Sequence, residues 1–487
     1  MSKIMPMRGF LTSSSAASPL AVRSLGLAFA TALVLAPAPP ASAATVAAAA
    51  TATPAAVRDQ AAVPGSTRSL PLVPLSRERV PGTAPEQGLY RAGLERFSLL
   101  GVVWDDPDTE LRGGVRVRTR SAVTGQWSGW QDVETHNADH RADPGTAEGS
   151  SRRVRGATAP LWVGDSDGVE VRVRAAGPGG GDGTGLPSGK RAGSAGASLP
   201  PGLRLELVDP GAGPAAGERG GTGQGLPRSP RDDDPPRTAL DTEAALAASA
   251  ANADITAFGA TAIPELDRAA TEQELTRLQG PVRGKPYIGP RPRIVTRRGW
   301  GADESLRERG FVYTKKIKAA FVHHTATGNA YTCAQAPSVI RGIYRYHVKS
   351  MGWRDIGYNF LVDKCGTLYE GRAGGVAKAV LGAHTLGFNT NSMGIAVIGT
   401  YGAAKPSSAA VTAVARLTAW KLGLYGADPN GRTYLTSGGG NLYPKGKNVR
   451  LHVISGHRDG FATECPGKRL YAKLGTARSS AARYQGR

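Results

Sequence analysis

The stretch K-A-A-F-V-H-H, residues 318–324, decides the fold of the last part of this chain. Its apolar run predicts a buried strand that ends in two adjacent histidines. A second stretch, G-H-R-D-G-F-A-T-E-C-P-G at 456–467, follows another apolar run and contains His457 and Cys465. Neighbouring residues of a strand point to opposite faces, so only one of the two adjacent histidines can face a shared cleft. Together the stretches predict one site built from a strand end and a later loop.

The sequence around these stretches alternates between helical and strand patterns. Pro337 opens an apolar-faced helical pattern, and residues 409–424 form a second amphipathic helix. Residues 358–371 read as strand, turn and strand, 392–399 as a near-continuous apolar strand, and 449–456 as a last strand that delivers His457. The pattern predicts an α/β fold class, with a C-terminal mixed β-sheet covered by helices.

Two imidazoles and one thiolate, from His323, His457 and Cys465, make a three-ligand zinc set. Structural zinc sites usually close with four protein ligands, whereas a three-ligand site leaves a position for water. Neither stretch contains a C-x-x-C or H-x-x-x-H pair, so the spacing is not that of a zinc finger. The alternative is two unrelated histidines and a buried free thiol.

The positive charge is concentrated in the last part of the chain. The 487 residues, enough for two or three domains, carry a net charge of +21. Residues 286–487 hold 30 Lys and Arg against 9 Asp and Glu, and the charges of the remaining residues cancel. A basic surface favours a polyanionic partner, such as nucleic acid or a bacterial wall, although solubility alone is the alternative.

The N-terminus has the pattern of an export signal. Basic residues from Lys3 to Arg23 precede an apolar run at 25–36, and A-S-A at 41–43 predicts a cleavage site. We therefore expect residues 1–43 to be a signal peptide; a lone membrane anchor is the alternative, although the run is short for a bilayer. Export predicts a secreted, wall-associated protein without membrane contact after cleavage, and it argues against nucleic acid as the partner.

Cysteine usage agrees with an oxidising compartment. Cys333 and Cys365 flank a predicted helix and strand, and we expect them to form a disulfide. Cys465 is then left over, and metal ligation supplies a role for it. Pairing of Cys465 between chains, in a mainly structural surface protein, is the alternative.

The remaining chain divides into a β region and two low-complexity segments. Strand-like segments recur from 89 to 210 and predict an all-β, sandwich-like domain of unknown role with a Gly-rich flexible insert at 177–189. They are residues 96–104, 114–120, 127–133, 168–175 and 203–208. Trp127 and Trp130 form a sugar-stacking platform or are ordinary core or edge aromatics.

Composition sets the other boundaries. We expect a disordered spacer at 44–88 and a disordered linker at 211–285, because Ala, Pro, Gly and opposing charges dominate them. The last domain then spans 286–476, with a basic tail at 477–487.

The segment from about Arg293 to Leu474 resembles the peptidoglycan recognition protein and type 2 N-acetylmuramoyl-L-alanine amidase family, in a bacterial, actinobacterial-like form. The matching stretches are R-R-G-W-G-A, F-V-H-H-T-A-T, G-W-R-D-I-G-Y-N-F-L-V, Y-E-G-R, L-G-A-H-T-L-G-F-N-T-N-S-M-G-I-A-V-I-G-T-Y and G-H-R-D…T-E-C-P-G. The resemblance implies Zn²⁺ held by His323, His457 and Cys465. It also implies cleavage of the amide between N-acetylmuramic acid and L-Ala of the stem peptide.

The same resemblance implies catalytic roles for two hydroxyls. Tyr358 matches a tyrosine beside the metal, and Thr463 stands where recognition proteins have threonine and related phage enzymes have lysine. We expect the Tyr358 hydroxyl to orient the attacking water or to donate to the oxyanion that develops during hydrolysis, and the Thr463 hydroxyl to donate to that oxyanion; a core tyrosine is the alternative for Tyr358. Ala396 occupies the position of a glutamate base in other members, so the general base stays unassigned.

Four further matches suggest the substrate groove. They are Trp353, Arg372, His384 and Asn389, and Arg372 is expected to pair a carboxylate such as that of diaminopimelate. A structural role is the alternative for each. The partner is then peptidoglycan or its muropeptides, with anionic wall polymers as a further candidate, and we expect a monomer.

The other histidines and Glu370 receive no role in the chemistry. We expect His324 and His347 to be structural, and His136 and His140, in a polar loop, to be ordinary surface residues. Glu370 has no evident second carboxylate, which counts against hydrolysis of sugar bonds.

The sequence therefore predicts a secreted zinc-dependent amidase. The main rival is a non-catalytic peptidoglycan-binding protein. Cys465 argues against that rival, because the resemblance implies that binding-only members lack the cysteine ligand.

Overall fold

The computed structural model describes residues 65–75, 84–135, 137–177, 198–213, 242–281 and 284–487, all within one compact unit, Asp59–Arg487. The predicted signal peptide, and the Gly-rich insert apart from its first residue, lie outside the described residues. Among the described residues, none of the helices has the length and apolar character needed to span a membrane.

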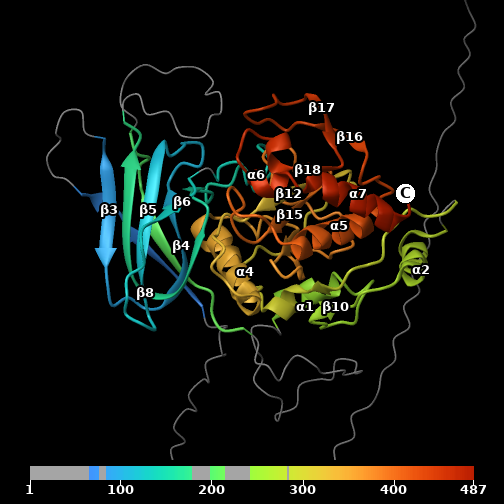
Figure 1. The fold of residues 1–487 in the computed structure, drawn as a ribbon, viewed down its shortest axis with the longest axis horizontal. Coiled ribbons are helices and arrows are strands. Elements are labelled where there is room, and N and C mark those ends of the chain that lie inside the picture. Colours follow the sequence, from blue (N-terminus) through green and yellow to red (C-terminus); the bar gives the residue numbers. More distant parts are fainter. Residues whose placement is uncertain (1–64, 76–83, 136, 178–197, 214–241, 282–283) are drawn as a thin grey trace, which may run out of the picture. The chain divides into compact units, whose positions relative to one another are not determined.

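The N-terminal domain is all β, as the sequence predicts (Figure 1). Its strands form one branched sheet in the order β1-β9-β4-β8-β3-β2, with β5 on β8, β6 on β5 and β7 on β4. The long β8 pairs with β4 in its first half and with β3 and β5 in its second half, so the sheet closes over an apolar core. The strands are β1 Ser66–Pro71, β2 Val73–Pro74, β3 Glu86–Arg91, β4 Phe97–Trp104, β5 Gly113–Ser121, β6 Gln131–Val133, β7 Gly156–Ala157, β8 Leu161–Ala175 and β9 Arg204–Asp209.

The structure differs from the spacer predicted at 44–88. Ser66–Pro71 forms β1, which pairs with β9 along its whole length, and β3 begins at Glu86. The segment S-T-R-S-L-P has little apolar alternation, because β1 is an edge strand that is only partly buried. Its order comes from backbone pairing, which the side-chain pattern does not reveal.

The C-terminal domain is a mixed sheet covered by helices, as predicted. The sheet order is β10-β11-β14-β13-β15-β12-β18, and β12 runs parallel to β15 and β18. The strands are β10 Ala262–Ile263, β11 Ile294–Val295, β12 Ala319–His324, β13 Phe360–Val362, β14 Leu368–Glu370, β15 Ser392–Val397 and β18 Ile454–Gly456. A separate hairpin pairs β16 Arg432–Thr436 with β17 Asn448–His452, so the predicted strand at 449–456 is divided between two sheets.

Helices cover both faces of this sheet. One face packs against α5 and α7, and the other packs against α4, which is followed by a π-helical turn, Tyr346–Ser350. The helices are α1 Glu243–Ala250, α2 Arg268–Gln279, α3 Arg297–Trp300, α4 Ala336–Arg345, α5 Ser408–Gly423, α6 Lys468–Tyr471 and α7 Leu474–Gln485. The predicted helices at Pro337 and 409–424 are thus present as α4 and α5.

The structure also moves the predicted limits of this domain. The linker at 211–285 contains α1, β10 and α2, and the side chains of Thr242 and Asp267 cap the two helices. The basic tail at 477–487 lies largely in α7, whose Ala477 and Ala481 are buried against α5. Short caps and small buried alanines give a weak apolar pattern, which is why composition alone suggested disorder.

The β domain packs directly on the C-terminal domain through α4 and the π-helical turn (Figure 1). The Tyr346 hydroxyl donates to the Thr158 carbonyl at 3.1 Å. Gly101 makes room for the Tyr346 side chain, since a Cβ at position 101 would lie 2.3 Å from the Tyr346 hydroxyl oxygen. Ser350 donates to the Glu206 carboxylate at 2.9 Å. The two domains therefore share a packed, hydrogen-bonded boundary.

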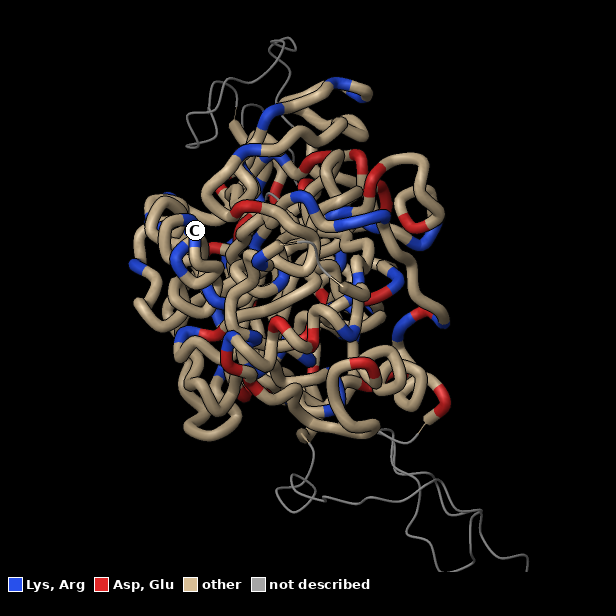
Figure 2. Tube along the Cα trace, turned by 90° about the vertical axis from the view of Figure 1, so that its right-hand side faces the viewer, with Lys and Arg blue, Asp and Glu red and all other residues tan. Residues whose placement is uncertain are grey.

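Basic and acidic positions are interspersed along the trace in Figure 2. An anionic wall polymer as a partner stays a prediction.

Candidate metal centre

Parallel strand pairing places the first two predicted ligands side by side. His323 is the penultimate residue of β12, and His457 directly follows β18. Val322 pairs with Gly456, so both histidines lie at the same end of the sheet, where the carboxyl ends of β12 and β18 meet. The carboxyl ends of neighbouring parallel strands are where open α/β sheets usually form their sites.

Four buried side chains, three of them predicted, meet at this edge. Donor atoms of His323, His457, Cys465 and His140 all lie within 4.8 Å of one another. Cys465 Sγ lies 3.8 Å from His323 Nδ1, and His140 Nε2 lies 3.3 Å from His457 Nδ1. The expectation that His140 is an ordinary surface residue is wrong, because the residue is only 5% exposed. His136 lies outside the described residues.

The environment keeps the imidazoles of His323 and His457 neutral. Burial, followed by the field of neighbouring histidines, lowers the pKa of His457 to about 3 and that of His323 well below its usual value. Burial also raises the pKa of the Cys465 thiol. Neutral imidazole is the form that ligates a metal, and a bound cation would favour the thiolate.

The donor set fits zinc. Nitrogen and sulfur ligands in a compact buried group are the usual zinc set. Asp139 Oδ2, a buried carboxylate oxygen beside this group, has no hydrogen-bond partner among the described residues. The residues present are therefore compatible with the ion that the sequence predicts.

Two predicted substrate residues support a predicted ligand instead of lining an open groove. His384 Nδ1 lies 3.3 Å and Thr385 Oγ1 lies 3.4 Å from His323 Nε2. Asn389 Oδ1 accepts from the backbone N–H groups of His384 and Thr385 at 2.7 and 3.0 Å. A Cβ on Gly394 would lie 2.4 Å from the His384 ring, so this glycine lets the ring pack on β15. In the described structure these side chains position His323.

The two predicted catalytic hydroxyl residues border the cluster. The Tyr358 ring centroid lies 5.6 Å from that of His323, and burial raises the Tyr358 pKa well above its usual value. Thr463 Oγ1 accepts from the Cys465 backbone N–H at 3.2 Å. Both residues are therefore close enough to act on a group held at the centre.

Trp353 and Arg372 are also buried. Trp353 packs against His347, with ring centroids 4.5 Å apart and ring planes tilted by 44°. The Arg372 guanidinium donates to both carboxylate oxygens of Glu148 at 2.8 Å each. In the described structure Arg372 therefore pairs with a carboxylate of the β domain, and its pairing with a substrate carboxylate stays a prediction.

His324 and His347 are structural, as expected. His324 Nδ1 accepts from the backbone N–H of Tyr401 at 3.2 Å, and His347 Nδ1 accepts from that of Gly357 at 3.1 Å. Burial lowers the pKa of both histidines to about 3. Neither ring belongs to the four-residue cluster.

The cysteines are arranged as predicted. Cys333 and Cys365 form a disulfide, which ties the start of α4 to the turn between β13 and β14. Cys465 is free and buried. Its burial argues against pairing between chains.

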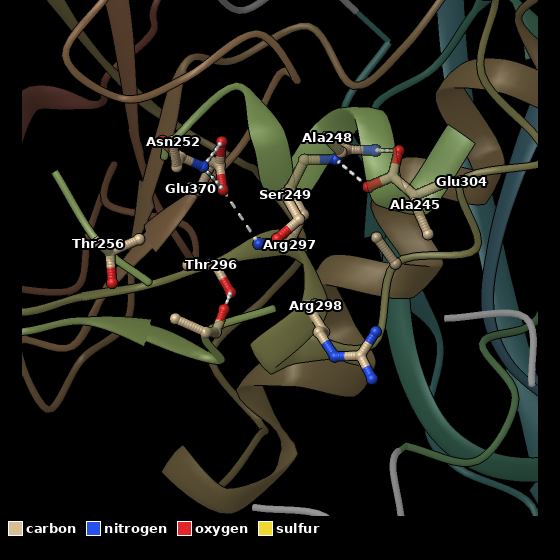
Figure 3. A pocket seen from close by; sticks show the side chains of 12 residues that line it. Ala245, Ala248, Ser249, Asn252, Thr256, Thr296, Arg297, Arg298, Glu304 and Glu370 are labelled. Carbon is tan, nitrogen blue, oxygen red and sulfur yellow. Dashed lines mark hydrogen bonds and ion pairs between the residues drawn. The ribbon is translucent and has the colours of Figure 1, made fainter. Parts of the chain in front are cut away.

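A separate cavity beside α1 contains Glu370 (Figure 3). Asn252 donates to both Glu370 carboxylate oxygens, and the Arg297 backbone N–H donates to one of them. Glu304 also lines this cavity, but the side chains of Arg297 and Arg307 bind its carboxylate. These partners identify the two carboxylates as parts of a network that fixes α1 and α3 to the sheet.

Sequence reasoning missed the contribution of the β domain. His136 and His140 stand in H-x-x-x-H spacing, within H-N-A-D-H-R-A-D, and that spacing is a local signal for metal binding. Nothing in the sequence indicates that this loop reaches a strand end nearly two hundred residues later.

Comparisons with known proteins match both domains. A family model described as N-acetylmuramoyl-L-alanine amidase matches residues 313–468, and one described as Rv3811 N-terminal galactose-binding domain-like matches 43–198. Peptidoglycan-recognition protein SC2 of Drosophila simulans is 31% identical over 183 residues, which are 38% of this chain and 85% of that protein. The human N-acetylmuramoyl-L-alanine amidase is 34% identical over 199 residues, 40% of this chain and 28% of that enzyme.

A solved structure, Drosophila PGRP-LB, matches 37% of this chain and 91% of its own at 26% identity, with a TM-score of 0.29. At that score the superposition adds nothing to the sequence comparison. The sequence relatives suffice: this chain belongs to the family of peptidoglycan-recognition proteins and N-acetylmuramoyl-L-alanine amidases.

Proposed function

We propose that this protein is a secreted, zinc-dependent N-acetylmuramoyl-L-alanine amidase. Its reaction is hydrolysis of the amide between N-acetylmuramic acid and L-Ala of peptidoglycan stem peptides. One observation carries the proposal: the donor atoms of three buried residues lie close together at the carboxyl ends of β12 and β18. These residues are His323, His457 and Cys465. The amidase family match over the same segment supports it.

The ligands we propose are the two imidazoles and the Cys465 thiolate. When bound, zinc supplies Lewis-acid activation of water and of a carbonyl group. His384 and Thr385 hold the His323 ring in place, and such supports fix the orientation of a ligand. The cysteine distinguishes this site from one that only binds wall fragments.

Tyr358 and Thr463 are the proposed oxyanion donors. The Tyr358 ring and the Thr463 hydroxyl lie beside the cluster, and a buried site strengthens hydrogen bonds to an oxyanion. A threonine brings no charge, so we assign the larger part to Tyr358. The general base stays unassigned, since Ala396 provides no carboxylate.

Arg372 is the strongest candidate for recognising the stem peptide. Its guanidinium already makes the paired contact with a carboxylate that a stem-peptide carboxylate would make. Trp353, His384 and Asn389 stay candidates for the groove, although each is buried in the described structure.

Export to the cell wall completes the proposal. The sequence pattern of residues 1–43 supports a cleaved signal, and the Cys333–Cys365 disulfide suits an oxidising compartment. N-terminal sequencing of the mature protein from culture medium should find a start near residue 44, and an intact N-terminus would contradict export.

The decisive experiment is product analysis by mass spectrometry. The zinc-loaded chain and its His140→Ala and Cys465→Ala variants are each incubated with a soluble muropeptide. Amidase activity releases a sugar with a free lactyl carboxyl group and a peptide with a new N-terminal L-Ala. We expect these products from the His140→Ala chain and none from the Cys465→Ala chain. A zinc-loaded His140→Ala chain that binds the muropeptide without cutting it would identify a binding protein.

A further inference from the structure

We propose that His140 is a fourth ligand of the metal centre, and that residues 137–148 fill the substrate groove, so that the folded chain is latent. This inference rests on the proposed function, because it names the regulation of that site. The segment belongs to the loop between β6 and β7, so it comes from the other domain.

The first argument is the placement of the His140 ring. Its Nε2 lies 3.3 Å from His457 Nδ1, and two nitrogens on one tetrahedral zinc ion lie about 3.3 Å apart, given Zn–N bonds of about 2.0–2.1 Å. Its other nitrogen, Nδ1, lies 3.1 Å from Asp139 Oδ1. A carboxylate on one nitrogen of a ligating histidine leaves the lone pair of the other nitrogen for the metal.

The second argument is what the rest of the segment covers. Asp143 Oδ1 accepts from Gly387 N and from Asn389 Nδ2 at 2.7 Å each. Glu148 makes its two 2.8 Å contacts with Arg372. The segment thus places the His140 nitrogen at the candidate metal centre. Its two carboxylates occupy Asn389 and Arg372, which the sequence analysis assigns to substrate binding.

The third argument is access. His323 and His457 are 0% exposed and Cys465 is 1% exposed with the segment in place. A wall peptide has to reach the metal ion that these residues would hold, and a fourth protein ligand, His140, would take the position that water or substrate needs. The segment therefore has to leave before the proposed reaction can take place.

Ordinary domain packing is the alternative explanation, and the chemistry of the contacts argues against it. Asp139, His140 and Asp143 are all less than 9% exposed, and burial of such groups is costly unless each finds a specific partner. Their partners are the candidate ligands and groove residues themselves. Because β6 and β7 bound the loop, it can be displaced without breaking a long strand.

The test uses the full chain loaded with cobalt(II), whose visible spectrum reports coordination, and azide as an external ligand. Variants are His140→Ala, and Asp143→Asn combined with Glu148→Gln, which weakens the segment without touching a ligand. Arg152→Ala, an exposed position in the same loop, is the matched control. Wild type and control should not respond to azide, whereas both test variants should respond.

Hydrolysis of a soluble muropeptide is measured on the zinc forms in parallel. The test variants should be at least about tenfold faster than wild type, because the rate follows the fraction of chains that are open. A wild-type cobalt spectrum that responds to azide as strongly as that of His140→Ala overturns the inference, and so do equal rates. If only the variants respond to azide but none of the proteins cuts, latency of the centre stands and the proposed function fails.

Discussion

The variants Glu148→Gln and Arg372→Met test how much the ion pair between these two residues stabilises the packing of the β domain on the candidate groove. The two side chains are 8% and 5% exposed, and they share two hydrogen bonds of 2.8 Å. Removing one partner of a buried ion pair typically costs about 3–5 kcal/mol, because the other charge stays buried without compensation.

The structure refines this magnitude for each partner. After Glu148→Gln, Arg372 keeps a carbonyl acceptor, Ile356 O at 2.9 Å, so we expect the low end, about 3 kcal/mol. Arg372→Met also removes the donor to the Ile356 carbonyl, so we expect it to lower the free energy of unfolding by about 4–5 kcal/mol. The double variant leaves neither charge buried, and it should cost about 2–3 kcal/mol less than the sum of the two single changes.

Urea unfolding followed by tryptophan fluorescence, at fixed zinc concentration, provides the free energies of unfolding. The exposed pair Arg96–Asp165 is the matched control, and it should show a coupling of about 1 kcal/mol or less. Additive effects at Arg372 and Glu148, within about 0.5 kcal/mol, would refute the reasoning, because they would mean that the two charges do not meet in solution.

Three further predictions follow from other contacts. Thr385→Val removes a hydroxyl from His323 and should weaken zinc binding about 10–100-fold in a chelator competition; unchanged affinity would contradict this role. Burial raises the pKa of Glu370 to about 7, so its stabilising contribution is complete below pH 4.5 and is lost as pH rises through 7. Glu370→Gln should remove this decline, on the order of 3 kcal/mol, from unfolding free energies measured between these pH values, and a retained decline would count against it. Replacing Cys333 and Cys365 by serine opens a loop of 32 residues and should lower the unfolding free energy by about 3–4 kcal/mol in the same urea assay, whereas an unchanged midpoint would contradict that contribution.

Strong periodic patterns made most of the central elements predictable. The apolar run before His323 is β12, the strand at 392–399 is β15, and the helix opened by Pro337 is α4. Such elements are buried on at least one face, so their sequences show a clear apolar periodicity. Elements held mainly by backbone pairing or by helix caps have a weaker apolar pattern. β1 and α1 are of that kind, and both fell in segments predicted to be disordered.

The candidate centre was predictable only within one domain. His323, His457 and Cys465 follow neighbouring strand ends or the loop after them, so their meeting follows from topology. His140 belongs to another domain, and its approach depends on how that domain packs through Tyr346 and Thr158. Neither composition nor periodicity encodes such packing. The groove residues Asn389 and Arg372 were assigned to a substrate, whereas in the folded chain their partners are carboxylates of the same chain.

The most direct measurement is anomalous diffraction at the zinc edge from crystals of the full chain grown with zinc. The account predicts one strong peak bonded to His323, His457 and Cys465, at about 2.0–2.3 Å from each donor atom. A map without a peak among these three side chains, from crystals that hold zinc elsewhere, would contradict it.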